Sequence, residues 1–212
     1  MRASQFRIAA LGIVVALSLT AAACSSDSKT ATTATTAKSS ATTQDAAKAA
    51  GLTATSFGPG CAAVPTDGKG SFSGMAQDPA ATAASNNPAL STLVAAVKAA
   101  GLVDTLNGTG PFTIFAPTND AFAKIDKATL AKVLADKATL TKILTYHVIA
   151  GQKMNAQQLA DAGTVKTVEG DSVKITKAGD TININGQTAV VCGNVQTANG
   201  TVQIIDTVLM PS

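Results

Sequence analysis

The sequence predicts one α+β domain over residues 61–212, a normal length for a single domain. Two observations lead to this prediction. Apolar residues recur at helical spacing in the first half of the segment, whereas from Thr164 onward they alternate with polar residues and are separated by turn signals. Helices that come before a run of antiparallel strands are typical of an α+β fold rather than of alternating βαβ units.

The N-terminus has the three parts of a secretory signal. Positive charge at Arg2 and Arg7 precedes an apolar stretch from Ile8 to Ala23, whose last four residues are small. This stretch has 16 residues, fewer than the roughly 20 that a membrane span needs. Residues 1–23 are therefore predicted to be a cleaved leader, and the protein is predicted to be exported.

Cys24 stands directly after the small residues of the leader. The segment Leu19–Cys24 resembles a bacterial lipobox, with Ala21 where most lipoboxes have Leu. The resemblance implies that the thiol takes a diacylglyceryl group and becomes the first residue of the mature chain. Two or three acyl chains on one residue suffice for stable anchoring, so we expect the membrane to be a partner through Cys24 at the outer face of the cell. The alternative is ordinary cleavage that leaves Cys24 as an exposed thiol.

Residues 24–60 are predicted to be a disordered tether between the lipid and the domain. Of the 26 residues from Ser25 to Ala50, 20 are Ser, Thr or Ala, and none is Val, Ile, Leu, Met or aromatic. Such a segment buries too little apolar surface to offset its ordering entropy. A flexible chain from Ser25 to Gly60 would span roughly 30 to 36 Å. The tether would hold the domain away from the bilayer, and whether it carries O-linked sugars stays open.

The charge of the chain gives no sign of a nucleic-acid partner. The formal net charge is +3, and loss of Arg2 and Arg7 with the leader leaves 14 lysines against 13 acidic residues, or +1. The lysines are scattered and aromatic residues make up only 3% of the chain. Neither phosphate neutralisation nor base stacking has an evident source. We expect a monomer that binds no nucleic acid and no cofactor.

Helical spacing begins in the first half of the domain. Leu90, Leu93, Val94 and Val97 share one face of a helix that should end near Gly101. A short apolar strand is predicted at 112–115 and should join the later sheet. After it, Thr118 can cap a helix that has an acid in its first turn.

Two near-copies follow, at 127–134 and 137–144, each preceded by an aspartate at 126 or 136 that can act as an N-cap. We interpret them as two short consecutive helices with apolar pairs turned inward. Asn155 and Gln158 have the spacing of a capping box for one more short helix.

The strands are predicted from a period of two. Val173 and Ile175 alternate with polar residues, and turn signals occur at 169–171, 178–180, 185–186 and 199–200. A run of hairpins is therefore expected. The last strand, 202–209, is almost continuously apolar and is predicted to lie inside the sheet.

Three segments in order resemble the motifs of one family. Residues 112–122 (FTIFAPTNDAF) are similar to the first signature box of the fasciclin (FAS1) domain, Tyr146–Val148 to its central Tyr-His motif, and 199–209 (NGTVQIIDTVL) to its second box. With the lipobox, the tether and the pair Cys61 and Cys192, the chain is most similar to the secreted immunogenic lipoprotein antigens of mycobacteria and related actinobacteria. The resemblance implies a wedge-shaped β-sandwich flanked by helices.

The family resemblance also implies a function in adhesion or surface interaction, through an extracellular protein or another cell-surface component, with no common catalytic activity. The positions that match the motifs and are candidates for structure or recognition are Thr113, Asp120, Tyr146, His147 and Asp206. Cys61 and Cys192 are expected to form a disulfide, because the compartment is oxidising and lipidation removes Cys24 from pairing. The alternative is two unpaired buried thiols.

Two of these candidates can also be judged from the residues alone. His147 is the only histidine, which excludes a site built on several imidazoles. We interpret it as a core residue with one ring nitrogen bonded to a backbone carbonyl, and keep a recognition surface around Tyr146 and His147 as the alternative. Asp206 is interpreted as a buried, hydrogen-bonded acid within the last strand.

Three functions therefore remain. The first is a surface interaction module, and the second is a lipoprotein that holds a small hydrophobic ligand in a pocket of some hundreds of cubic ångströms. An unrecognised hydrolase is the third, and it would need a nucleophile within hydrogen-bond reach of His147.

Overall fold

The computed structural model describes residues 55–211. The predicted leader, the lipidation site Cys24 and residues 25–54 of the predicted tether lie outside the described residues. Phe57 already forms an antiparallel bridge with Gly193 and is packed against the core. Packing within the described residues thus starts before Cys61.

Ten short helices precede or separate the strands of the described chain. They are η1 (Pro59–Ala63), α1 (Phe72–Met75), α2 (Ala80–Ser85), η2 (Pro88–Leu90), α3 (Ser91–Ala100), α4 (Val103–Asn107), α5 (Asn119–Ala123), α6 (Lys127–Ala135), α7 (Lys137–Tyr146) and α8 (Ala156–Ala162). Helix α3 buries Leu93 and Val97 as its spacing predicted, and it ends at Gly101, which adopts a left-handed conformation with φ 73°.

The predicted helix caps are confirmed. Thr118 accepts a hydrogen bond from the backbone of Ala121 at the start of α5. Asp126 and Asp136 each accept from two backbone N–H groups at the starts of α6 and α7. Asn155 forms both halves of a capping box with Gln158 on α8. These caps satisfy N–H groups that the first turn of a helix leaves without partners.

The inward packing that we predicted for both near-copies is complete only in the second, whereas in the first Leu130 and Val133 are partly buried against the core. Helix α7 buries Leu140, Ile143 and Leu144. Helix α6 buries no residue, and Leu134 on it is 39% exposed. The two helices have nearly the same sequence, so their positions in the fold, which local spacing does not reveal, make the difference.

Seven strands form one sheet in the order β2-β1-β7-β6-β5-β4-β3. Their bounds are β1 Phe112–Pro117, β2 Val148–Ala150, β3 Thr164–Lys166, β4 Ser172–Ala178, β5 Thr181–Ile184, β6 Thr188–Thr197 and β7 Gly200–Ile205. The predicted hairpins are present from β3 to β7, and the early strand β1 joins the later sheet by pairing in parallel with β7.

Strand β7 lies between β1 and β6 and is buried at all six positions, as predicted for the last strand. It ends at Ile205, however, rather than at Leu209. The residues that follow, up to Pro211, form an irregular C-terminal segment.

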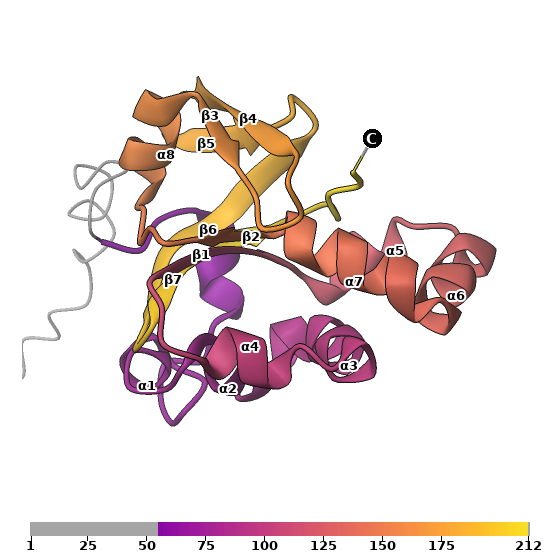
Figure 1. Cartoon of the computed structure of the whole chain (residues 1–212). Coiled ribbons are helices and arrows are strands. Elements are labelled where there is room, and N and C mark those ends of the chain that lie inside the picture. The colour runs from indigo at the N-terminus through magenta and orange to yellow at the C-terminus, as the bar shows by residue number, and fades with distance from the viewer. Residues whose placement is uncertain (1–54, 212) are drawn as a thin grey trace, which may run out of the picture. The chain divides into compact units, whose positions relative to one another are not determined.

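Strand β1 separates two hydrophobic clusters. Side chains of a strand point alternately to its two faces, and here Ile114 and Ala116 belong to a cluster with α2, α3 and α7, whereas Phe115 belongs to a cluster with α8 and β3–β6. Figure 1 shows the same arrangement, with α2, α3 and α4 below β1 and β7, and with β3, β4, β5 and α8 above them. The sheet is nearly closed, because the N–H of Val168 after β3 donates to the carbonyl of Val148 in β2.

A disulfide joins Cys61 of η1 to Cys192 of β6, across a sequence separation of 131 residues. Cys192 is fully buried. The bond fixes the start of the domain to one of its inner strands.

Candidate functional site

The Tyr-His motif lies where α7 ends and β2 begins. Tyr146 is the last residue of α7, His147 caps the helix, and Val148 opens β2. The imidazole of His147 is 2% exposed. Its Nδ1 lies 2.8 Å from the carbonyl oxygen of Ile143, and its Nε2 accepts a hydrogen bond of 3.0 Å from the N–H of Leu209.

These two bonds fix the chemical state of His147. A carbonyl oxygen can only accept and a backbone N–H can only donate, so Nδ1 carries the proton and Nε2 is the acceptor. Burial lowers the pKa of His147 to about 4, and the bond to the Ile143 carbonyl opposes this only in part. With both nitrogens bonded to backbone, the ring has no free nitrogen to act as a general base.

Tyr146 bonds to a different part of the chain. Its ring is buried, with 4% of the residue exposed. The hydroxyl accepts a hydrogen bond of 3.0 Å from Nδ2 of Asn185 and donates one of 3.4 Å to the carbonyl of Ser172. Tyr146 therefore holds the β4 and β5 end of the sheet, while His147 holds the C-terminal segment.

A groove lies between these two parts, and we call it the polar groove. Its volume is about 370 Å³. It is lined by Tyr146, Ser172, Asn185, Gln187, Thr188, Thr207, Val208, Leu209 and Met210. None of these lining residues is charged.

Asp206 corrects one of our predictions. It follows β7 instead of lying within it, and its side chain is 35% exposed. One carboxylate oxygen accepts from the N–H of Ala189 at 2.9 Å, and the other pairs with Nζ of Lys124 at 3.0 Å. Sequence reasoning took the apolar run around Asp206 for an unbroken strand, and the ion pair with Lys124, 82 residues away, gave no local signal.

The surroundings of Asp206 act on its acidity in two directions. Burial raises the pKa of Asp206, but hydrogen bonds from Lys124, Ala189 and Thr207 outweigh it, so that the pKa lies below its usual range. Asp120, which is exposed in the first turn of α5, lines the same shallow groove of about 230 Å³ as Lys124 and Asp206.

Thr113 is a structural residue. It is fully buried in β1, where its hydroxyl donates to the carbonyl of Gln152 and accepts from the N–H of Met154, both at 2.8 Å. These bonds tie β1 to the loop after β2. The candidates from the sequence are thus distributed over three places: Tyr146 beside the polar groove, Asp120 and Asp206 at the second groove, and Thr113 and His147 in the interior.

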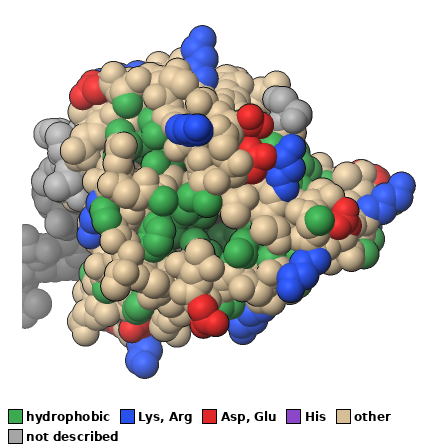
Figure 2. All heavy atoms as spheres, viewed as in Figure 1, with side chains coloured by type: hydrophobic (Ala, Val, Ile, Leu, Met, Phe, Trp, Pro, Cys, Tyr) green, Lys and Arg blue, Asp and Glu red, His purple; other side chains and the backbone are tan. Residues whose placement is uncertain are grey.

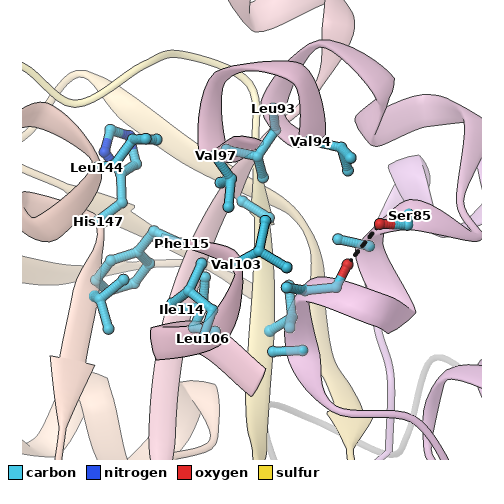
Figure 3. Close-up of a pocket in the computed structure, with 16 residues that line it drawn as sticks. Ser85, Leu93, Val94, Val97, Val103, Leu106, Ile114, Phe115, Leu144 and His147 are labelled. Atoms are coloured by element: carbon cyan, nitrogen blue, oxygen red, sulfur yellow. Dashed lines mark hydrogen bonds between the residues drawn. The ribbon is translucent and has the colours of Figure 1, made fainter. Parts of the chain in front are cut away.

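His147 also lines an apolar cavity. Figure 3 shows the side chains that line it, among them Leu93, Val94 and Val97 from α3, Val103 and Leu106 from α4 and Ile114 from β1, while the one hydroxyl, Ser85, bonds to its own helix. Figure 2 shows a hollow with hydrophobic side chains on this face of the molecule. The cavity has a volume of about 40 Å³, which is room for a few waters.

Two further observations concern the part of the chain from 55 to 211. No three His, Cys, Asp or Glu side chains there come together as a metal site would require. No helix in this part combines the length and the apolar character of a membrane span.

The fold and these motifs agree with one family of domains, and the chain belongs to it. A family model described as "Fasciclin domain" matches residues 88–211. The cell surface glycolipoprotein MPT83 of Mycobacterium tuberculosis is 50% identical over 163 residues, which cover 73% of this chain and 72% of that protein. The immunogenic protein MPB70 of Mycobacterium bovis is 48% identical over 163 residues, which cover 73% of this chain and 81% of that protein.

A solved structure has the same fold. It is a FAS1 domain pair from the insect cell adhesion molecule Fasciclin I, with a TM-score of 0.56 and 20% identity. The match covers 63% of this chain and 51% of that chain, so this chain spans about half of the two-domain structure. The α+β fold of the FAS1 type that the sequence predicted is thus confirmed.

Sequence reasoning missed most of the polar groove. Asn185 drew notice only as part of a strand and turn and Thr207 only as part of the second family box, whereas Ser172 and Gln187 drew none. The signal that could have found Asn185 is that a residue at a left-handed turn position presents its side chain outward, where it can bond to a neighbouring element.

Proposed function

We propose that this protein is a lipid-anchored surface protein whose FAS1 domain binds an extracellular protein or another cell-surface component without catalysing a reaction. The anchor would be Cys24, directly after the leader. The proposal is supported by membership of the Fasciclin family and by relatives that are named as cell surface glycolipoproteins.

The observation that supports a binding function most directly is the state of His147. The only imidazole in the chain is buried and bonded at both nitrogens to backbone. A triad of the serine-hydrolase type needs an imidazole nitrogen that faces a nucleophile. The Tyr-His motif thus supports a structural role for His147, which holds the C-terminal segment in place, rather than a role in catalysis.

The alternative, a lipoprotein that holds a small hydrophobic ligand, has less support. The cavity between α3, α4 and β1 has an apolar lining, which favours it, but its volume is about 40 Å³. Pockets for drug-sized ligands have roughly 300 to 1,000 Å³. Accommodation of such a ligand would require the helices to separate from the sheet and expose their shared core.

The test is a binding measurement with the mature chain. The chain from residue 24, with Cys24→Ser to keep it soluble, is labelled and added to intact cells and to immobilised extracellular proteins. We expect saturable binding that an excess of unlabelled chain displaces. Binding that does not saturate, or that heat-unfolded chain shows equally, would exclude a specific surface interaction.

A further inference from the structure

We propose that the polar groove beside Tyr146 binds neutral oligosaccharides. This inference rests on the proposed function, because it assigns a class of partner to the surface-binding domain. The groove has about 370 Å³, which is in the range of small-molecule sites. It is also larger than the apolar cavity that His147 lines.

The first argument is the absence of net charge. No residue that lines the groove carries a charged side chain. The ion pair of Lys124 with Asp206 contacts the lining residue Thr207, whose hydroxyl lies 3.3 Å from Lys124 and 3.1 Å from Asp206, and the two charges compensate each other. An anionic ligand is usually recognised by Arg or Lys, and a metal ion by carboxylates, so the groove favours a neutral ligand.

The second argument is the set of hydrogen-bonding groups. Ser172 and Gln187 line the groove and are exposed, and within residues 55–211 their side chains form no hydrogen bond. One hydroxyl and one amide provide donors and acceptors along the groove. A sugar also presents groups that both donate and accept, so this set matches a chain of hydroxyls better than it matches an apolar ligand.

The third argument is that the groove is held in place before a ligand binds. Asn185 adopts a left-handed conformation with φ 52°, and its amide accepts from the N–H of Lys174 at 2.9 Å and donates to Tyr146 at 3.0 Å. The opposite wall is fixed by the bond from Leu209 to His147. A preformed site loses less conformational freedom on binding, which matters for ligands that bind through hydrogen bonds.

The remaining wall suits the less polar face of a sugar ring. Met210 lines the groove and is 44% exposed, and Val208 lies beside it. By contrast, protein partners are usually anchored by exposed Trp, Tyr or Arg. The groove has no Trp or Arg, and its one aromatic residue, Tyr146, is 4% exposed. The groove therefore lacks the side chains that usually anchor a protein partner, and the choice of an oligosaccharide rests on its uncharged hydroxyl and amide lining.

The test uses the mature chain with Cys24→Ser, labelled with ¹⁵N. The probes are maltohexaose, xylohexaose and mannohexaose, with inorganic phosphate, a heparin hexasaccharide and a neutral Ser/Gly peptide for comparison. We expect saturable amide shifts at 185–188 and 207–210 with at least one neutral hexasaccharide, and none with phosphate at the same concentration. The absence of such shifts up to about 20 mM sugar, which is weaker than useful binding, would overturn the proposal, as would shifts there with the peptide alone.

Variants locate the site. Gln187→Ala and Ser172→Ala each remove one exposed hydrogen-bonding group and should weaken sugar binding about fivefold or more. Gln152→Ala is the matched control, because Gln152 is an exposed glutamine outside the groove. Equal affinity of all three variants would overturn the assignment to the groove. If the parent chain binds none of the neutral hexasaccharides but still binds cells, the oligosaccharide proposal fails while the proposed function stands. Loss of cell binding by the parent chain would contradict the proposed function itself.

Discussion

The N–H of Leu209 donates a hydrogen bond of 3.0 Å to Nε2 of His147, the residue that directly follows Tyr146. Tyr146 in turn bonds to Asn185 at 3.0 Å. Two neighbouring residues of one motif thus hold two segments that come from different parts of the chain. The hydrogen bonds of Tyr146 and His147 therefore hold the two walls of the polar groove, one wall each.

Stability should depend on pH through His147. Its pKa is about 4 in the folded chain against an ordinary value of 6.5, so between these values the unfolded chain binds the proton and the folded chain does not. Stability is therefore fully present above about pH 6.5 and is lost as the pH falls toward 4. We expect a loss of about 2 to 3 kcal/mol between pH 7 and about pH 4.5, measured by urea denaturation.

The control for this prediction is His147→Gln, which cannot titrate but can offer an amide oxygen to Leu209. Carboxylates contribute equally to both proteins, so the difference between the two pH profiles reports His147. A parent chain whose profile runs parallel to that of the variant would show that His147 is not the source.

Reduction of the disulfide should destabilise the domain strongly. A bond that closes a loop across 131 positions contributes up to about 5 kcal/mol in the chain-entropy model. We expect the melting temperature to fall by about 10 °C on reduction. The variant Cys61→Ala with Cys192→Ala should melt low with or without reductant. Two reactive thiols in the unfolded, unreduced chain with Cys24→Ser would contradict the pairing.

The two partners of the Lys124–Asp206 pair should differ in importance. Lys124→Met removes only an exposed charge, with 53% of the lysine side chain exposed, and should change stability by less than about 0.5 kcal/mol. Asp206→Ala also leaves the N–H of Ala189 without its acceptor and should cost about 1 to 2 kcal/mol. Chemical denaturation measures both. Equal effects would mean that the ion pair is the main contribution of Asp206.

The two near-copies allow a matched comparison of helix caps. Asp136→Ala should lower the melting temperature by about 2 to 4 °C, because α7 carries Leu140, Ile143 and Leu144 into the core. Asp126→Ala should change it less, because α6 buries no residue. Instead, hydrogen exchange should become faster in α6 alone. A larger effect of Asp126→Ala would be inconsistent with this difference in burial.

Cys24 should carry the lipid. Cys24→Ala should release the protein into the medium and remove the acyl mass from the N-terminal peptide, as measured by fractionation and mass spectrometry. A protein that stays in the membrane fraction after this substitution would rule out Cys24 as the anchor.

The sequence predicted those features whose causes are local. The caps at Thr118, Asp126 and Asp136 depend on bonds within three residues, and the helix spacing and hairpin turns depend on short windows. The exposure of α6 and the end of β7 depend on what packs against them, which short windows do not contain. The polar groove depends on contacts between Tyr146 and Asn185, 39 residues apart, and its residue types are common in any turn.

The disulfide also determines how the domain would bear a pulling force. A force applied at the N-terminal end enters through Phe57 and reaches Cys61 before any of the helices α1 to α8. The covalent bond passes this load directly to Cys192 in β6. The segment between the two cysteines, which contains all of these helices, is thereby spared extension. A pull at the N-terminal end therefore does not extend the segment that contains α7 with Tyr146 and His147.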